Sequence, residues 1–89
     1  MKKIYCELHM FDLNQRIFIV DPETGYKEQV AMVPMEELPE VISAISSEQH
    51  INQVLLSGNS IFGKAVSEDV VTYSKLNYNN NEIKVEVLK

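Results

Sequence analysis

Residues 34–57 read PMEELPEVISAISSEQHINQVLLS, a helix-like stretch followed by a short apolar run. The apolar residues of the first part recur at three- and four-residue spacings and therefore share one helical face: Leu38, Val41, Ile42 and Ile45. Residues 50–57 are too short for a typical helix and apolar enough for a buried strand. Because neighbouring parallel strands need a long crossover, this stretch predicts a strand parallel to the first strand of the chain.

The start of the predicted helix is acidic. Glu36, Glu37 and Glu40 lie at its N-terminal end, where negative charge complements the helix dipole. Pro39 fits the first helical turn, because its missing N–H costs little there. Clustered carboxylates can also bind a cation, but a solvated acidic helix start is the simpler interpretation.

Three strand-like segments precede the helix. The first is Lys3–Phe11, in which apolar residues occupy every second position: Ile4, Cys6, Leu8 and Met10. The second is Arg16–Val20, a run of β-branched and aromatic residues. Asp21–Gly25 has Pro early and Gly late, which is typical of a type I turn closed by a residue at positive φ. Tyr26–Val33 is therefore predicted to return antiparallel as the third strand, and Pro34 ends it.

A second helix and a final strand are predicted after the apolar run. Gly58 and Asn59 end the fourth strand, and the helix that follows carries apolar residues at three- and four-residue intervals: Phe62, Val66, Val70 and Tyr73. The run Asn79–Asn81 stops this helix, and Ile83–Leu88 alternates as the last strand. The sequence thus predicts one α/β domain over residues 1–89, with a single mixed sheet and elements in the order βββαβαβ.

Composition limits the classes of function. The chain has 89 residues, 45% of them hydrophobic and 24% charged, which is the usual balance of a small soluble domain. Its formal net charge of −5 makes binding to nucleic acid unfavourable and a basic partner more natural. Cys6 is the single cysteine, and no apolar segment is long enough for a membrane helix, so we expect a cytoplasmic protein.

The order of the elements resembles the beginning of the ribonuclease H-like fold. This resemblance implies the strand order 3-2-1-4-5, with the second strand antiparallel to the others and helical right-handed crossovers. Residues 54–59, the helix after them and residues 82–87 also resemble small uncharacterised bacteriophage proteins. That second resemblance implies a protein encoded by a bacterial virus or mobile element.

Nucleases of the ribonuclease H-like superfamily hold two metal ions with acidic residues. One of these acidic residues lies on the first strand, and another lies near the end of the fourth. Glu7 lies on the first predicted strand, but the fourth ends in Ser57-Gly58-Asn59, without a carboxylate. We therefore assign no catalytic residue, metal or cofactor by this resemblance. A divergent metal-dependent nuclease is the third of our functional hypotheses.

The alternative hypothesis is a nucleotide or small-ligand site at Gly58, Asn59 and Ser60, which precede a predicted helix N-terminus. Residues 58–64 also match the spacing G-x-x-x-x-G-K of a phosphate-binding loop. Ala65 follows, however, where such loops carry the Ser or Thr that binds magnesium.

Three further residues have reactive or metal-binding side chains. His9 and His50 lie on different segments without a ligand partner at diagnostic spacing. Cys6 lies on an alternating apolar face, which favours a packed thiol over a nucleophile.

Both faces of the three-stranded part carry large apolar side chains. Ile4, Leu8, Met10, Ile17 and Ile19 share one parity, and the opposite parity holds our candidate interaction residues: Tyr5, Phe11, Phe18 and Val20. The second face needs a cover, which is either a helix from the same chain or a second copy in a homodimer. Our first hypothesis is a non-enzymatic protein that acts by macromolecular interaction with an unknown protein partner.

Overall fold

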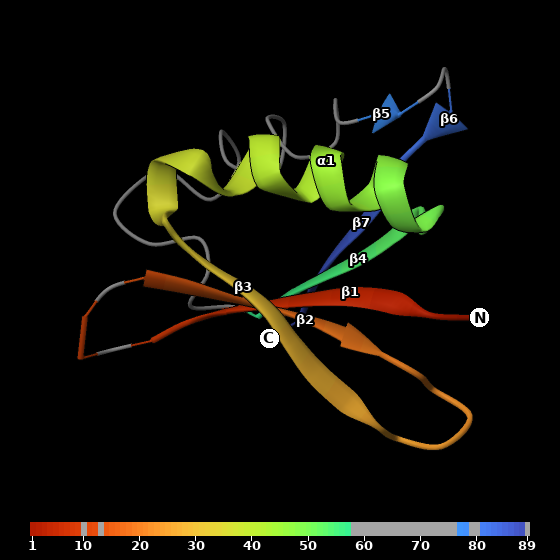
Figure 1. Ribbon diagram of the computed structural model, residues 1–89, viewed down its shortest axis with the longest axis horizontal. Coiled ribbons are helices and arrows are strands. Elements are labelled where there is room, and N and C mark those ends of the chain that lie inside the picture. Colours follow the sequence, from red (N-terminus) through yellow and green to blue (C-terminus); the bar gives the residue numbers. More distant parts are fainter. Residues whose placement is uncertain (10, 13, 58–76, 79–80, 89) are drawn as a thin grey trace.

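Five strands form one mixed sheet in the order β3-β2-β1-β4-β7, and a helix lies against one of its faces (Figure 1). The computed structural model describes residues 1–9, 11–12, 14–57, 77–78 and 81–88. The strands of this sheet are β1 (Lys3–Leu8), β2 (Asn14–Val20), β3 (Lys27–Pro34), β4 (Gln53–Ser57) and β7 (Lys84–Leu88). A 3-10 turn, η1 (Met35–Glu37), leads directly into the helix α1 (Leu38–Gln49).

The predicted parallel pairing of the first and fourth strands is confirmed. β1 and β4 run parallel, with Ile4 opposite Val54, and β4 and β7 also run parallel. β2 is antiparallel to both of its neighbours, β1 and β3. The strand order is the expected one because α1 connects β3 to β4 and carries the chain across the two intervening strands.

The first strand is shorter than predicted, ending at Leu8 instead of Phe11. The chain turns directly after Leu8, where the His9 amide donates to the Asn14 carbonyl over 2.8 Å. The Asp12 carboxylate accepts a hydrogen bond from the Asn14 amide at 3.1 Å and ties the turn from inside. Pairing therefore resumes at Asn14, two residues earlier than the predicted start of the second strand.

The turn between β2 and β3 forms as predicted. Gly25 has a φ of 77°, a conformation that a residue with a side chain adopts only at a cost. Its amide donates to the Asp21 carbonyl over 2.8 Å, and the Asp21 amide donates to the Tyr26 carbonyl over 2.9 Å. β3 begins one residue later than predicted, at Lys27.

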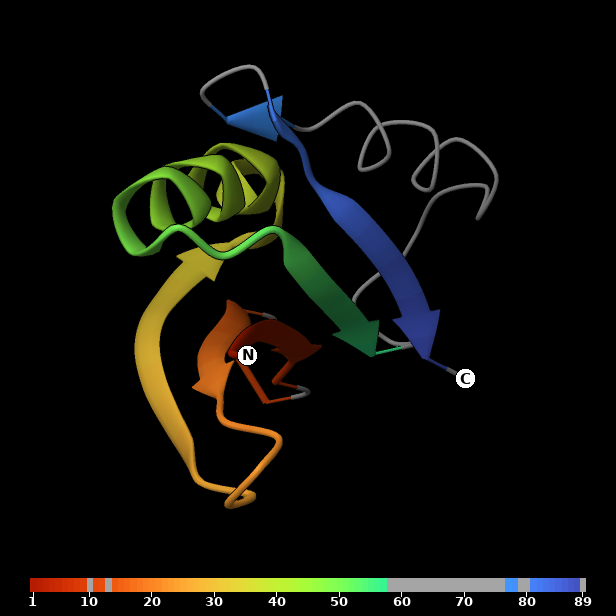
Figure 2. The same ribbon diagram turned by 90° about the vertical axis from the view of Figure 1, so that its right-hand side faces the viewer.

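The third strand contains an irregularity that the sequence did not predict. Ile17 of β2 pairs with Ala31, whereas the next residue, Phe18, pairs with Gln29. Val30 is therefore the extra residue of a β-bulge, and β3 curves along its length (Figure 2).

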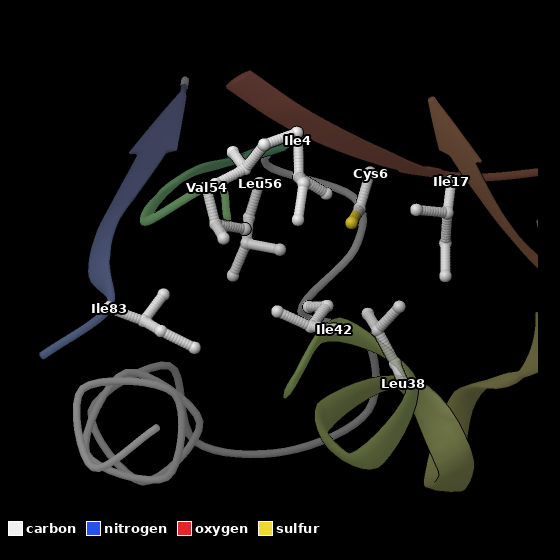
Figure 3. Close-up of a cluster of buried hydrophobic side chains, with 9 residues drawn as sticks. Ile4, Cys6, Ile17, Leu38, Ile42, Val54, Leu56 and Ile83 are labelled. Carbon is white, nitrogen blue, oxygen red and sulfur yellow. The ribbon is translucent and has the colours of Figure 1, made fainter. Parts of the chain in front are cut away.

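Helix α1 packs its predicted apolar face on the sheet. Leu38 and Ile42 are fully buried, and Val41 and Ile45 pack at the edge of the same cluster. Side chains from three strands, the helix and the segment before β7 meet there (Figure 3). The buried hydrophobic cluster consists of Ile4, Cys6, Ile17, Leu38, Ile42, Ile51, Val54, Leu56 and Ile83. The core parity predicted for β1 and β2 is thus confirmed at Ile4, Leu8 and Ile17; Met10 lies outside the described residues.

The helix ends at His50, which has a left-handed backbone with φ 57°. The amides of His50 and Ile51 both donate to the Ser46 carbonyl, which closes the last turn. Since this cap uses His50 and Ile51, β4 starts at Gln53, three residues after the predicted start at residue 50.

The predicted second helix, including Phe62, Val66, Val70 and Tyr73, lies outside the described residues. Before β7, the described residues include a small antiparallel pair of strands, β5 (Asn77–Tyr78) and β6 (Asn81–Glu82), which the sequence pattern did not predict. This pair lies beside α1 in both ribbon views, and β5 contacts that helix (Figures 1 and 2). Ile83 is buried directly before β7. None of the described helices combines the length and the apolar character that crossing a membrane requires.

We expect Ser46→Ala to stabilise the protein. The Ser46 hydroxyl is fully buried in α1, with no hydrogen-bond partner among the described residues. Its removal should raise the free energy of unfolding by about 1 kcal/mol, because an unsatisfied buried polar group is lost and alanine is the better helix former. Urea unfolding would measure the gain. Ser47→Ala, at a partly exposed position of the same helix, is the control and should gain less; an equal gain would contradict the buried-hydroxyl explanation.

Candidate interaction site

The sheet has a second face, directed away from α1, which we call the open face. Because side chains alternate along a strand, it is formed by the residues between the buried ones. The pairing register arranges these residues in three rows that cross all five strands. Each row holds one residue from each strand, in the order β3, β2, β1, β4 and β7.

The first row is rich in lysine and is called the lysine row. Its members are Lys27, Val20, Lys3, Gln53 and Lys84. Lys3 and Gln53 are neighbours because the residues after them, Ile4 and Val54, are paired in the parallel ladder. With strands about 4.8 Å apart, the row is roughly 19 Å long and has a lysine on every second strand.

The second row, the aromatic row, lies two residues further along β1. Its members are Gln29, Phe18, Tyr5, Leu55 and Glu86. The third row consists of Met32, Arg16, Glu7, Ser57 and Leu88. Apolar side chains thus occupy the middle of the open face.

A cation and two rings form the central contact of the open face. The Tyr5 and Phe18 rings are half-buried, with centroids 5.9 Å apart and an angle of 34° between their planes. The Lys27 ammonium lies 4.9 Å from the centroid of the Phe18 ring and 5.4 Å from that of Tyr5. A cation in this position is attracted by the ring electrons, which at an exposed site contributes about 0.5–1 kcal/mol.

The bulge at Val30 places Lys27 over these rings. Ala31 and Val33 pack against the core, so uninterrupted alternation would direct the odd-numbered residues Lys27 and Gln29 to the same face. The extra residue reverses the parity, and Lys27 pairs with Val20 on the open face instead.

Tyr5 also contacts Glu7 of the third row. Its hydroxyl donates to the Glu7 carboxylate over 3.0 Å. Two effects raise the pKa of Tyr5 above its ordinary value of 10.0. The larger is desolvation by burial, and the smaller is the nearby Glu7 carboxylate. The tyrosine is therefore a neutral hydrogen-bond donor at physiological pH.

The structure brings together three of the four predicted interaction residues. Tyr5 and Phe18 are adjacent in the aromatic row, and Val20 lies next to them in the lysine row. Phe11 is separate, because β1 ends before it. It lies in the following turn, where it is 95% exposed, and its ring centroid is 5.6 Å from that of His9. The structure thus separates Phe11 from the other three predicted residues.

Lys27 is the important residue of this site that the sequence pattern did not indicate. A strand pattern assigns faces by counting, and the count fails at a bulge. The β-branched Val30 carries no local signal of an irregular position, so only the pairing with β2 identifies Lys27 as part of the open face.

Lysine and arginine gather on this face. Of the described residues, the strands place Lys3, Arg16, Lys27 and Lys84 here, together with the carboxylates Glu7 and Glu86. Arg16 also forms an ion pair with Asp12 at 3.0 Å, at the end of the β1–β2 hairpin. The local charge is therefore positive, whereas the whole chain has a net charge of −5.

The other candidate residues do not form a shared site in the described part of the chain. Gly58, Asn59 and Ser60 lie outside the described residues, so the predicted ligand site stays a prediction. His9 contacts Asp12 at 3.2 Å near one end of β1, while His50 caps the helix. No group of three His, Cys, Asp or Glu side chains that could hold a metal ion occurs among the described residues.

The acidic helix start lies apart from the open face. Glu36, Glu37 and Glu40 are exposed on η1 and the first turn of α1, in agreement with a solvated helix start.

Comparisons of the chain with protein-family models, with curated proteins and with solved structures find no match. The interpretation of the open face therefore depends on its own geometry and chemistry.

We expect the Cys6 thiol to be unreactive in the folded protein. It is completely buried, and this burial raises its pKa to about 12, so almost no thiolate is present near pH 8. A disulfide reagent such as dithionitrobenzoate should modify it only after denaturant is added. Rapid modification of the native protein would show that Cys6 is accessible and would contradict a purely packing role.

Proposed function

We propose that this protein is a non-enzymatic interaction protein that binds a protein partner through the open face. The observation that carries the proposal is the contact among Tyr5, Phe18 and Lys27, two half-buried rings under a cation on a sheet face directed away from α1.

Such a group has the properties of a binding anchor. Aromatic side chains supply large contact areas and are enriched in the energetically important parts of protein interfaces. Here the rings are held by adjacent strands, so little conformational freedom remains to be lost when a partner binds. Met32, which is 48% exposed, continues the apolar surface next to Arg16.

We further propose a ribonuclease H-like assignment for the domain, with a bacteriophage or mobile-element origin and a cytoplasmic location. The strand order and the antiparallel direction of β2 support the fold assignment. The assignment carries no nuclease activity with it, because function depends on the residues of a site and not on the fold.

A homodimer is one form of this proposal. The open face and the outer edge of β3, which pairs on one side only among the described strands, are both surfaces on which a second copy could pack around a two-fold axis. Sedimentation equilibrium of the unchanged protein separates self-association from binding of a different protein.

The test compares Phe18→Glu with Phe11→Glu in affinity capture from the native host, followed by mass spectrometry. Both variants place a charge at an aromatic position, but only Phe18 belongs to the open face. We expect the partner to be retained by the unchanged protein and by Phe11→Glu, and to be lost with Phe18→Glu.

Met32→Glu adds a second variant at an exposed position of β3, where we expect substitution to leave folding intact. Amide NMR spectra of each variant verify the fold before capture. A partner that binds folded Phe18→Glu and Met32→Glu as well as the unchanged protein would overturn the proposal.

A further inference from the structure

The charge of the open face is opposite to that of the chain. The lysine row places three ammonium groups across the five strands, at Lys3, Lys27 and Lys84. Lys27 and Lys84 are exposed and Lys3 is half-buried. Glu7 and Glu86 are the carboxylates of this face among the described residues. The remaining described carboxylates lie in turns, on the helix or elsewhere away from this face.

A small hollow lies beside this row. It has a volume of about 200 Å³ and is lined at β4 and β7 by Gln53, Leu55, Lys84 and Glu86, together with Val54 and Val85. The hollow thus connects the lysine row to the aromatic row, and it has room for one side chain of a partner. The hollow therefore lies directly beside the positive charge of Lys84.

We propose that the open face recognises an acidic protein segment that also carries apolar residues. Carboxylates of the segment pair with the lysine row, and an apolar side chain packs on the aromatic row or in the hollow. This inference rests on the proposed interaction function and names the chemistry of the partner. An acidic partner thus replaces the basic partner that we expected from the net charge. The charges close to the contact determine which partner binds, because more distant charges are screened by salt beyond about a Debye length.

Three observations favour a protein segment over single-stranded nucleic acid. Bases stack on open ring faces, but the Lys27 ammonium already lies over both rings. Glu86 ends the aromatic row and Glu7 lies beside Arg16 in the third row, where each would repel a continuous phosphate chain. The net charge of −5 opposes a long polyanion more than a short acidic segment.

The geometry suggests a defined probe. An extended chain advances about 3.3 Å per residue, so roughly seven residues, joined by about six such steps, cover the lysine row. The peptide Glu-Phe-Glu-Ser-Glu-Leu-Glu has this length, and alternation places its carboxylates on one side and its apolar groups on the other. The same peptide with glutamine in place of every glutamate is the matched uncharged probe.

Amide NMR titrations with both peptides, and with an oligothymidylate of similar length, test the inference. We expect the acidic peptide to shift the amides of the lysine and aromatic rows, to bind at least about tenfold more tightly than the glutamine peptide, and to weaken as salt is added. Equal binding of the two peptides, shifts elsewhere, no binding, or tighter binding of the oligothymidylate would each overturn it.

Substitutions locate the effect. Replacing Lys3, Lys27 and Lys84 together with glutamine keeps most of each side-chain stem and should weaken acidic-peptide binding by about tenfold or more, since each exposed pair contributes roughly 1.5- to 5-fold. Lys2→Gln is the control, because Lys2 precedes β1, and should bind as the unchanged protein does. Unchanged binding by the triple variant contradicts the proposed role of the row.

The same triple variant separates this inference from the proposed function. If it keeps the captured partner that Phe18→Glu loses, the open face is an interaction surface but its partner is not acidic. If Phe18→Glu and Met32→Glu also keep the partner, the interaction function itself is wrong.

Discussion

The parallel pairing of β1 with β4 is the contact on which the remaining arrangement depends. It requires α1 to cross from β3 to β4, and this crossover buries Leu38 and Ile42 against Ile4, Cys6 and the other core residues. Burial of this cluster fixes the parity of each strand, since a slip of one residue would expose the core side chains. The open face is therefore specified by the core, although its residues take little part in core packing.

Local patterns in the sequence were sufficient for the core residues and for the parallel pairing of β1 with β4, whereas the complete strand order was predicted only through a resemblance. Alternation identified Ile4 and Leu8, helical spacing identified Leu38 and Ile42, and the length of the crossover indicated a parallel pair. Each of these signals depends on residues close in sequence and on burial, which is the strongest single term in folding. The turn at Gly25 was equally clear because few residues tolerate its backbone conformation.

The candidate site was less predictable because its central contact depends on pairing between strands. The sequence pointed to Tyr5 and Phe18 but included Phe11, because alternation extended the first strand to Phe11, whereas β1 ends at Leu8. It missed Lys27 because Val30 leaves no local trace of the bulge. The left-handed cap at His50 was missed for a related reason: the cap uses two residues that alone look strand-like.

The bulge at Val30 has a consequence for how this surface can vary between related chains. Loss of Val30 alone would leave Gln29 opposite Phe18 and Ala31 opposite Ile17, and the strand would become regular with Lys27 still on the open face. A one-residue deletion is thus tolerable at this position. A deletion elsewhere in β3 would either remove the bulge by shifting the pairing with β2, or direct part of the strand's side chains to the opposite face of the sheet. The surface is encoded by chain length as well as by side-chain identity, so insertions and deletions in β3 are as informative as substitutions.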